Sequence, residues 1–340
     1  MPALFMDSPQ AGGKLETPHV KRLTEAAPSA LRGNGKTAQV TVGDTQVEVS
    51  NLGKIFYPSA GFTKGDVVNF YIRIAPVLLP HLKDRPITLK RYPEGVDGLF
   101  FYEKRCPPHR PHWIKTTNVP RREGGQINYC VVDTLPALVW AANLADLELH
   151  TFLHRMPHVD RPTALAFDLD PGAPANILSC CEVALRLKEL FDRLRLECFA
   201  KTSGSKGLQV YVPLNVPVTY DTTKAFALAV AESLQRQTPE AVVSKMSKAL
   251  RRGKVFVDWS QNDTHKTTVN VYSLRAKERP WVSTPITWKE VQAALKRNDP
   301  QALEFEAPAV LERVGKSGDL FAPVLKLRQK LPPPERIEAD

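Results

Sequence analysis

Cysteine is scarce in this sequence, and its spacing argues against two classes of stapled protein. Only five cysteines occur among 340 residues, and no two of them form a CxxC pair. This pattern disfavours a disulfide framework and a zinc knuckle, and it indicates a reducing compartment. No run of about 18 apolar residues could span a membrane. The first residues also lack the basic and apolar regions of a secretory signal. We therefore expect a soluble, cytoplasmic protein.

Acidic residues are the minority among the charged ones. Lys and Arg together number 46 against 36 Asp and Glu, which gives a net charge of +10. A basic balance of this kind favours a polyanionic partner, with nucleic acid as the first candidate. Hydrophobic residues make up 43% of the chain, which is enough for a buried core, and the length predicts two domains or one large one.

Strands and helices follow one another without strict alternation, which predicts the α+β class. Residues 1–37 lack any periodicity and are typical of a flexible tail. Two alternating runs around Gly43 and Asp44 then predict a hairpin, and Thr63 with Asp66 forms the capping pattern of a helix. Further helices are expected over 175–196, 221–250 and 287–298, and a strand within 267–276 is expected to close the sheet.

Two acidic side chains end the apolar run "AFDLDPG". Asp168 and Asp170 are two residues apart, so a strand would place both on one face. A third acid, Asp258, follows the apolar run of "KVFVDWSQND". Three such carboxylates on adjacent strand ends would suit Mg²⁺ or Mn²⁺, and a pair of these ions supports phosphoryl chemistry. The alternative is an ordinary acidic turn, since Asp-Pro-Gly is common turn chemistry.

The segment "KTSGSKG" predicts a short loop between two strands. Ser203, Ser205, Lys206 and Gly207 supply hydroxyls, backbone N–H groups and a positive charge, which together can bind phosphate oxygens. The P-loop pattern is absent, and taken alone the segment fits a plain hairpin. Combined with the acids, however, it indicates a nucleoside triphosphate.

Two further segments combine cations with aromatic rings or with one another. Phe100, Phe101 and Lys104 lie in "LFFYEKRCPPHRPHW", and Arg251 and Arg252 lie in "SKMSKALRRGK". Rings beside cations suit base stacking and phosphate contact. The alternatives are a core strand with charged flanks for the first segment and a solvated helix face for the second.

The motifs "FDLDP", "KTSGSKG", "VFVDWSQN" and "YSLRAK", in this order, resemble the polymerase domain of bacterial ligase D. That domain belongs to the archaeo-eukaryotic primase superfamily and acts in non-homologous end joining. The resemblance implies an RRM-like primase-polymerase catalytic core over 156–331. It also implies an N-terminal α/β unit over 38–155 that contacts DNA ends. Residues 332–340 would form a C-terminal tail.

The resemblance also assigns roles to single residues. Asp168, Asp170 and Asp258 match the ligands of Mn²⁺ or Mg²⁺, and His150 matches an active-site histidine. Lys54 and Lys64 match a pair that binds a downstream 5′-phosphate, and Phe100 and Phe101 match aromatics that stack on the DNA end. The predicted nucleotide-binding set is Ser203, Ser205, Lys206, Gly207, Gln209, Arg275 and Lys277. The predicted DNA-binding set adds Lys104, Arg251 and Arg252.

Two positions depart from the family pattern. Gln209 stands where the family usually has histidine, and Lys277 stands where arginine is common. Gln209 can donate a hydrogen bond but carries no charge, and a lysine cannot make the forked contact of an arginine. Both differences bear on how the triphosphate is held.

The implied reaction is template-directed addition of nucleotides, preferably ribonucleotides, to a primer 3′-OH at gaps and double-strand breaks. The implied partners are Ku and an ATP-dependent DNA ligase, in a bacterial cell and near the nucleoid. A two-metal nuclease or phosphoesterase would also need three acids, and a non-catalytic module could bind DNA ends without them. Both remain alternatives. The sequence also leaves open whether the chain stands alone or is one domain of a larger ligase.

Overall fold

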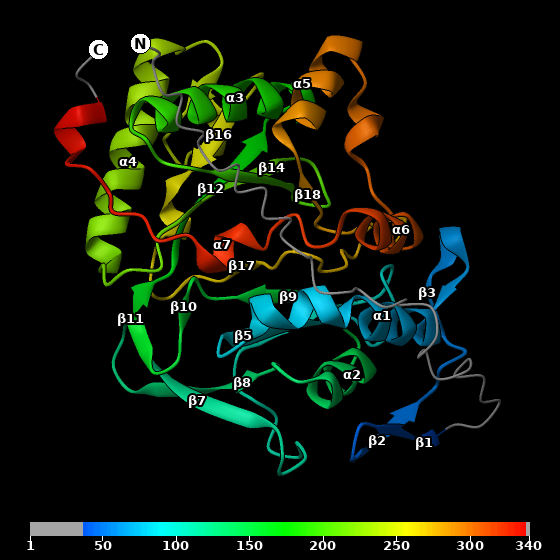
Figure 1. Ribbon diagram of the computed structural model, residues 1–340. Coiled ribbons are helices and arrows are strands. Elements are labelled where there is room, and N and C mark those ends of the chain that lie inside the picture. The colour runs from blue at the N-terminus through cyan, green and yellow to red at the C-terminus, as the bar shows by residue number, and fades with distance from the viewer. Residues whose placement is uncertain (1–36, 338–340) are drawn as a thin grey trace, which may run out of the picture.

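Two six-stranded sheets form the frame of this computed structural model, which describes residues 37–337 (Figure 1). The predicted N-terminal tail therefore lies outside the described residues except for Thr37, where the first strand begins. The last three residues of the predicted C-terminal tail also lie outside them, and Pro334–Ile337 within this tail form a short 3-10 helix. The mixture of helices and sheets confirms the expected α+β class.

The first sheet has the strand order β17-β9-β5-β8-β7, and β6 pairs with β5. Its strands are β5 (Pro86–Arg91), β6 (Phe101–Glu103), β7 (Lys115–Pro120), β8 (Gln126–Val131), β9 (Asp146–Thr151) and β17 (Thr268–Val269). Leu147 and Leu149 of β9 belong to the core that this sheet shares with α1 (Lys64–Leu82) and α2 (Leu135–Asn143). Strand alternation therefore turns Glu148 and His150 to the opposite face.

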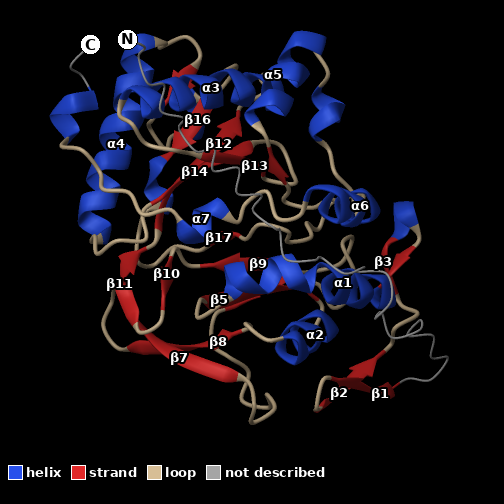
Figure 2. Ribbon diagram, in the orientation of Figure 1, coloured by secondary structure: helices blue, strands red, loops and turns tan. Residues whose placement is uncertain are grey.

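The second sheet has the order β15-β16-β12-β14-β13-β18. Its strands are β12 (Ala164–Pro171), β13 (Phe199–Thr202), β14 (Leu208–Pro213), β15 (Val242–Val243), β16 (Val255–Asp258) and β18 (Pro285–Ile286). The helices α3 (Ile177–Arg193), α4 (Tyr220–Gln237) and α5 (Trp288–Arg297) lie beside it (Figure 2). Phe167 and Leu169 of β12 enter the core, so Asp168 and Asp170 share the other face.

Smaller elements complete the fold. The predicted hairpin is confirmed as β1 (Thr37–Val42) paired with β2 (Thr45–Ser50). The predicted cap is confirmed too, since Thr63 and Asp66 form a reciprocal capping box at the start of α1. The remaining elements are β3 (Ile55–Tyr57), β4 (Phe62–Thr63), β10 (His154–Arg155), β11 (His158–Pro162), α6 (Ala307–Ser317) and α7 (Pro323–Lys326). No helix within residues 37–337 is long and apolar enough to cross a membrane.

Two expectations about local structure were wrong. The helix expected over 221–250 ends at Gln237, because Pro239 disfavours helical backbone at Thr238 and cannot donate a helical hydrogen bond. The strand expected within 267–276 is only β17, and it pairs with β9 of the first sheet rather than closing the second. The N–H of Asn270 then donates to the carbonyl of Leu149, which continues this connection.

One disulfide forms, although the cysteine pattern disfavours a disulfide framework and indicates a reducing compartment. Cys106 and Cys130 are bonded, while Cys180, Cys181 and Cys198 are free and buried. The N–H of Cys106 donates to the carbonyl of Asn128 at 2.7 Å, which places this segment beside β8. The odd number of cysteines could exclude a complete pairing, but it could not exclude one pair.

Candidate active site

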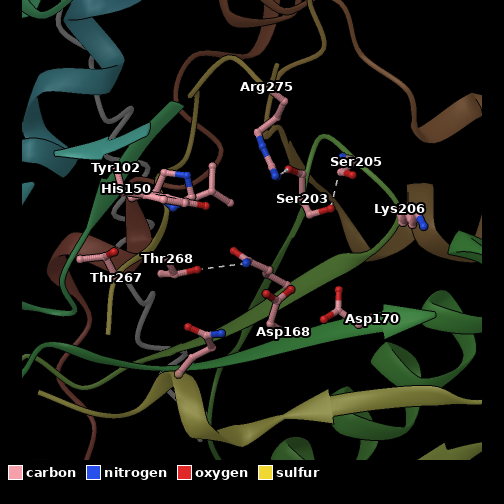
Figure 3. A pocket seen from close by; sticks show the side chains of 13 residues that line it. Tyr102, His150, Asp168, Asp170, Ser203, Ser205, Lys206, Thr267, Thr268 and Arg275 are labelled. Carbon is pink, nitrogen blue, oxygen red and sulfur yellow. Dashed lines mark hydrogen bonds between the residues drawn. The ribbon is translucent and has the colours of Figure 1, made fainter. Parts of the chain in front are cut away.

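A pocket of about 300 Å³ opens between the two sheets and collects side chains from both (Figure 3). From the predicted set it is lined by His150, Asp168, Asp170, Ser203, Ser205, Lys206, Gln209 and Arg275. Tyr102, Gln261, Thr267, Thr268 and Val269 complete the wall. Asp258, Gly207, Lys277 and the predicted DNA-binding residues do not line it. The sequence motifs therefore meet in one place although they lie far apart in the chain.

The acidic part of the pocket follows from strand register. Asp168 lies opposite Gln209 of β14 on one side and Asp258 of β16 on the other. Burial and the charge of Asp170 raise the pKa of Asp168 to about 7. Loss of solvent and the charge of Asp258 raise the pKa of Asp170 as well. Carboxylates this close favour either a proton or a cation between them.

Asp258 is held differently from the other two acids. Its Oδ1 accepts hydrogen bonds from the N–H and the hydroxyl of Ser260, and its Oδ2 accepts one from Gln261 at 2.8 Å. Of about four lone-pair positions on a carboxylate, these bonds use three. Within residues 37–337 no three His, Cys, Asp or Glu side chains are arranged so that they could hold a metal ion. The three-acid metal site thus stays a prediction.

The chemistry of Asp168 and Asp170 nevertheless fits a divalent cation. Both supply hard oxygen donors of the kind that Mg²⁺ and Mn²⁺ prefer. Burial and mutual repulsion raise both pKa values although Lys201 opposes the rise at Asp168 and Arg251, Arg275 and Lys206 oppose it at Asp170, so a further cation between the two acids would be favourable.

One side-chain hydroxyl, that of Ser203, binds two backbone N–H groups of the loop between β13 and β14. The Oγ of Ser203 accepts hydrogen bonds from the N–H groups of Ser205 and Gly207, both at 3.2 Å. Gly204 has φ +65°, and a Cβ there would lie 2.7 Å from the Cγ of Arg275. Gly207 packs against β12, because a Cβ there would lie 2.0 Å from the carbonyl oxygen of Leu169. Gly207 therefore shapes the loop, while Ser203, Ser205 and Lys206 face the pocket.

Gln209 is buried and faces the acids. Its Nε2 donates to the hydroxyl of Thr268 at 3.1 Å (Figure 3), and a hydrogen bond from it opposes the rise in the pKa of Asp168. Gln209 thus lies on the pocket side of its strand. Its register partners are the acid Asp168 on β12 and the base Lys201 on β13.

Several residues of the site escaped the sequence analysis. Lys201 is fully buried on β13, and its Nζ donates to the hydroxyl of Ser283 at 2.6 Å. Burial lowers the pKa of Lys201 to about 7, against the charge of Asp168, which raises it. Tyr102 packs edge to face against His150 with 6.1 Å between the ring centroids, and the Oε2 of Glu148 lies 3.0 Å from the Nε2 of His150. A lysine inside the apolar run "CFAKTS" was the only available signal for Lys201.

The aromatic residues of 100–102 divide into two positions. Tyr102 lines the pocket. Phe100 instead stacks on Tyr92 at 5.2 Å between ring centroids, and Phe101 lies beneath the guanidinium of Arg91. Phe100 and Phe101 are both exposed. They remain predicted stacking residues at the rim of the site.

Lys54 and Lys64 are brought together, as their predicted pairing requires. The N–H of Lys64 donates to the carbonyl of Lys54 at 2.8 Å. Burial, followed by the charges of Lys54 and Arg91, lowers the pKa of Lys64 to about 8. Lys54 pairs with the exposed Glu94 at 2.6 Å. Like charges gathered in this way favour an anion, which suits the predicted 5′-phosphate.

The remaining predicted cations lie around the pocket rather than in it. The guanidinium of Arg251 stacks on the ring of Phe256 at 3.8 Å, and its charge opposes the raised pKa of Asp170. Arg252 and Lys104 are exposed, and Lys104 lines a neighbouring hollow. Lys277 is partly buried, and burial and the charge of Arg275 lower its pKa.

Comparison with known proteins places this arrangement in a family. The family described as "LigD, primase-polymerase domain" matches residues 63–321. The chain belongs to the LigD primase-polymerase family. The four short motifs indicated a resemblance to ligase D, and the family match confirms it over most of the described residues.

Individual members of the LigD family agree with this result. The Multifunctional non-homologous end joining protein LigD of Mycolicibacterium smegmatis is 38% identical over 281 residues, which is 82% of this chain and 36% of that protein. The Bifunctional non-homologous end joining protein LigD of Bacillus subtilis is 30% identical, over 81% of this chain and 44% of that protein. The chain thus spans less than half the length of these relatives.

A solved LigD structure has the same fold. The polymerase domain of Mycobacterium tuberculosis ligase D, in a complex with DNA, matches with a TM-score of 0.77 and 38% sequence identity. The match covers 83% of this chain and 98% of that domain. The expected primase-polymerase fold is therefore confirmed.

Proposed function

We propose that the pocket is the active site of a template-directed nucleotidyltransferase, which adds nucleotides to a primer 3′-OH at DNA gaps and double-strand breaks. One observation carries this proposal: the acids Asp168 and Asp170 face the Ser203–Lys206 loop and Arg275 across a single pocket. Acids alone would suit a nuclease equally well. A cationic, hydroxyl-rich wall opposite them adds a place for a triphosphate, which a nuclease does not need.

The side chains of the pocket divide the work. Lys206 and Arg275 would hold the negative triphosphate, and the hydroxyls of Ser203 and Ser205 would orient its oxygens. Asp168, Asp170 and Asp258 would hold Mn²⁺ or Mg²⁺, and this ion would supply Lewis-acid chemistry for the phosphate and the hydroxyl that react. Holding both reactants in line supplies much of the rate in such reactions, so no protein nucleophile is required.

The wider surface would bind the nucleic acid. Lys54 and Lys64 would contact a downstream 5′-phosphate, while Phe100 and Phe101 would stack on the DNA end. The net charge of +10 supports general attraction to the phosphate backbone. Ribonucleotide preference, and partnership with Ku and an ATP-dependent DNA ligase near the bacterial nucleoid, belong to the same proposal. Their support is the resemblance to end-joining ligases.

A primer-extension assay on gapped DNA tests the proposal. We expect nucleotide-dependent extension that requires Mn²⁺ or Mg²⁺ and that Asp168→Ala abolishes. DNA binding should survive this change, because cationic side chains hold the phosphates. Comparing ribonucleotides with deoxyribonucleotides in the same assay tests the sugar preference. Shortening of the primer without extension would support a nuclease instead, and binding without any incorporation would support a DNA-end-binding module.

A further inference from the structure

Glu148 is a buried acid beside the pocket. It contacts His150 and Arg275, which line the pocket, and Lys90, which does not. Its Oε2 is 3.0 Å from the Nε2 of His150, 3.1 Å from the Nζ of Lys90 and 3.3 Å from the Nε of Arg275. Its Oε1 accepts hydrogen bonds from the N–H of Ala276 and the hydroxyl of Tyr92. The side chain is only 1% exposed.

These side chains come from three separate parts of the chain. Glu148 and His150 are two residues apart on β9, so both side chains lie on the face that turns away from the core. Lys90 comes from β5, where it lies directly opposite Glu148 in the strand register. Arg275 arrives after β17, from the far half of the chain. A buried carboxylate is costly unless it is paired and hydrogen-bonded, and these partners meet that requirement.

The surroundings keep Glu148 ionised. Burial alone would raise the pKa of Glu148, but the hydrogen bond from His150 and the charges of Arg275 and Lys90 outweigh it and hold the pKa below its usual range. An ionised carboxylate can only accept hydrogen bonds. His150 must therefore donate from Nε2, which leaves Nδ1 as the second nitrogen of the ring. The choice of tautomer is thus made by Glu148.

Arg275 connects the same carboxylate to the phosphate-binding loop. Its Nε faces Glu148, while its Nη1 donates to the backbone carbonyl of Ser203. The close approach requires Gly204, because a Cβ there would lie 2.7 Å from the Cγ of Arg275. A change in the charge of Glu148 would thus reach the loop through a single side chain.

We infer that Glu148 is a positioning residue, which orients His150 and Arg275 toward a bound nucleotide through one shared carboxylate oxygen. The inference rests on the proposed function, because it assumes that the pocket takes a nucleoside triphosphate. It assigns Glu148 no contact with the reacting atoms. Its effect passes through the imidazole and the guanidinium.

The first test needs neither nucleotide nor DNA. The groups that face His150 are Glu148, Lys90, Arg275 and the ring of Tyr102. Burial lowers the pKa of His150, Glu148 raises it, and the two cations lower it further. Glu148→Gln should therefore move the titration of His150 to lower pH, as followed by nuclear magnetic resonance of the imidazole nitrogens in the full chain. An unchanged His150 titration would overturn the inference.

A matched control is present elsewhere in the chain. Asp319 accepts a hydrogen bond from the Nε2 of His81 at 2.8 Å, so it forms the same kind of buried imidazole–carboxylate pair away from the pocket. Asp319→Asn should leave the titration of His150 unchanged. A shift in this variant equal to that in Glu148→Gln would show a general loss of folding and overturn the inference.

The second test separates positioning from structure by kinetics. Glu148→Gln should lower kcat/KM for the nucleotide about 10- to 100-fold, the range expected for losing a hydrogen bond to a charged group. The optimum pH should change as well, while KM for the DNA should stay constant. Equal losses in nucleotide and DNA parameters would indicate a structural role and overturn the inference.

A second variant covers the case in which Glu148→Gln does not fold. In Lys90→Met with Glu148→Gln, one buried cation and one buried anion are removed together, so no unpaired charge remains between them. This double variant should show a lowered kcat/KM for the nucleotide and a changed pH optimum. A wild-type protein without incorporation would refute the proposed function, whereas the His150 titration would still test the role of Glu148.

Discussion

Replacing Gly207 by alanine tests how tightly the loop positions the acids. A Cβ on Gly207 would lie 2.0 Å from the carbonyl oxygen of Leu169, and real Cβ atoms essentially never come closer than 3.0 Å to such an atom. The residues at the start of β14 must therefore move away from β12 by about 1 Å at this point. Leu169 stands between Asp168 and Asp170, so the displacement moves both carboxylates relative to the loop.

The expected effect on rate is larger than the effect on stability. A misplacement of about 1 Å in an active site costs about 100-fold in rate, whereas overpacking a core costs about 1–3 kcal/mol of unfolding free energy. Single-nucleotide extension under saturating DNA would measure kcat/KM, and thermal unfolding would measure stability. We expect kcat/KM of Gly207→Ala to fall about 100-fold while the protein remains folded.

A second glycine supplies the control. Gly315 lies in α6, and a Cβ there would meet nothing within 4 Å. Gly315→Ala should keep wild-type kcat/KM and should stabilise the helix by about 1 kcal/mol. The reasoning about Gly207 would be refuted by a Gly207→Ala protein with wild-type kcat/KM, because the acids would then tolerate the displaced strand.

Three further outcomes are expected. In metal-free protein, Asp168→Asn should raise Tm at pH 8 but not at pH 4. The raised pKa of Asp168, about 7, means that the wild type loses stability as the pH rises through it; equal Tm changes at both pH values would contradict this. The double variant Lys54→Ala, Lys64→Ala should bind gapped DNA with a 5′-phosphate no more tightly than DNA with a 5′-hydroxyl, and lower the salt slope by about one per lost contact. An unchanged preference in binding titrations would refute the pairing. Gln209→His should bind triphosphate more tightly than wild type as the pH falls from about 8 to 6, near the ordinary histidine pKa; a flat ratio of affinities would mean that residue 209 does not face the triphosphate.

Local patterns in the sequence predicted the parts of the site that depend on neighbours in the chain. Alternation placed Asp168 and Asp170 on one face, and the capping pattern placed the start of α1 at Thr63. The Ser203–Gly207 loop was found because its residues are contiguous. Each of these features lies within a stretch of at most five residues.

The features that sequence reasoning missed depend on distant contacts. Glu148 has no signal of its own, because two of the partners that keep it charged while buried, Lys90 and Arg275, lie far away in the sequence. The Cys106–Cys130 bond joins residues 24 apart and follows from the pairing of a loop with β8. Periodicity also could not show that β17 returns to the first sheet, since a two-residue strand has no period.

That returning strand limits how the protein can be divided. A fragment that ends at residue 155 would contain β9 but lack β17, and the edge of β9 beside His150 would expose unpaired backbone groups. Exposed edges of this kind invite pairing with other chains. In a hybrid protein made from two relatives, residues 268–269 should therefore come from the same relative as the first sheet. Otherwise β9 and β17 should be replaced together. Recombination breakpoints chosen at the boundary between the two sheets would otherwise yield insoluble hybrids.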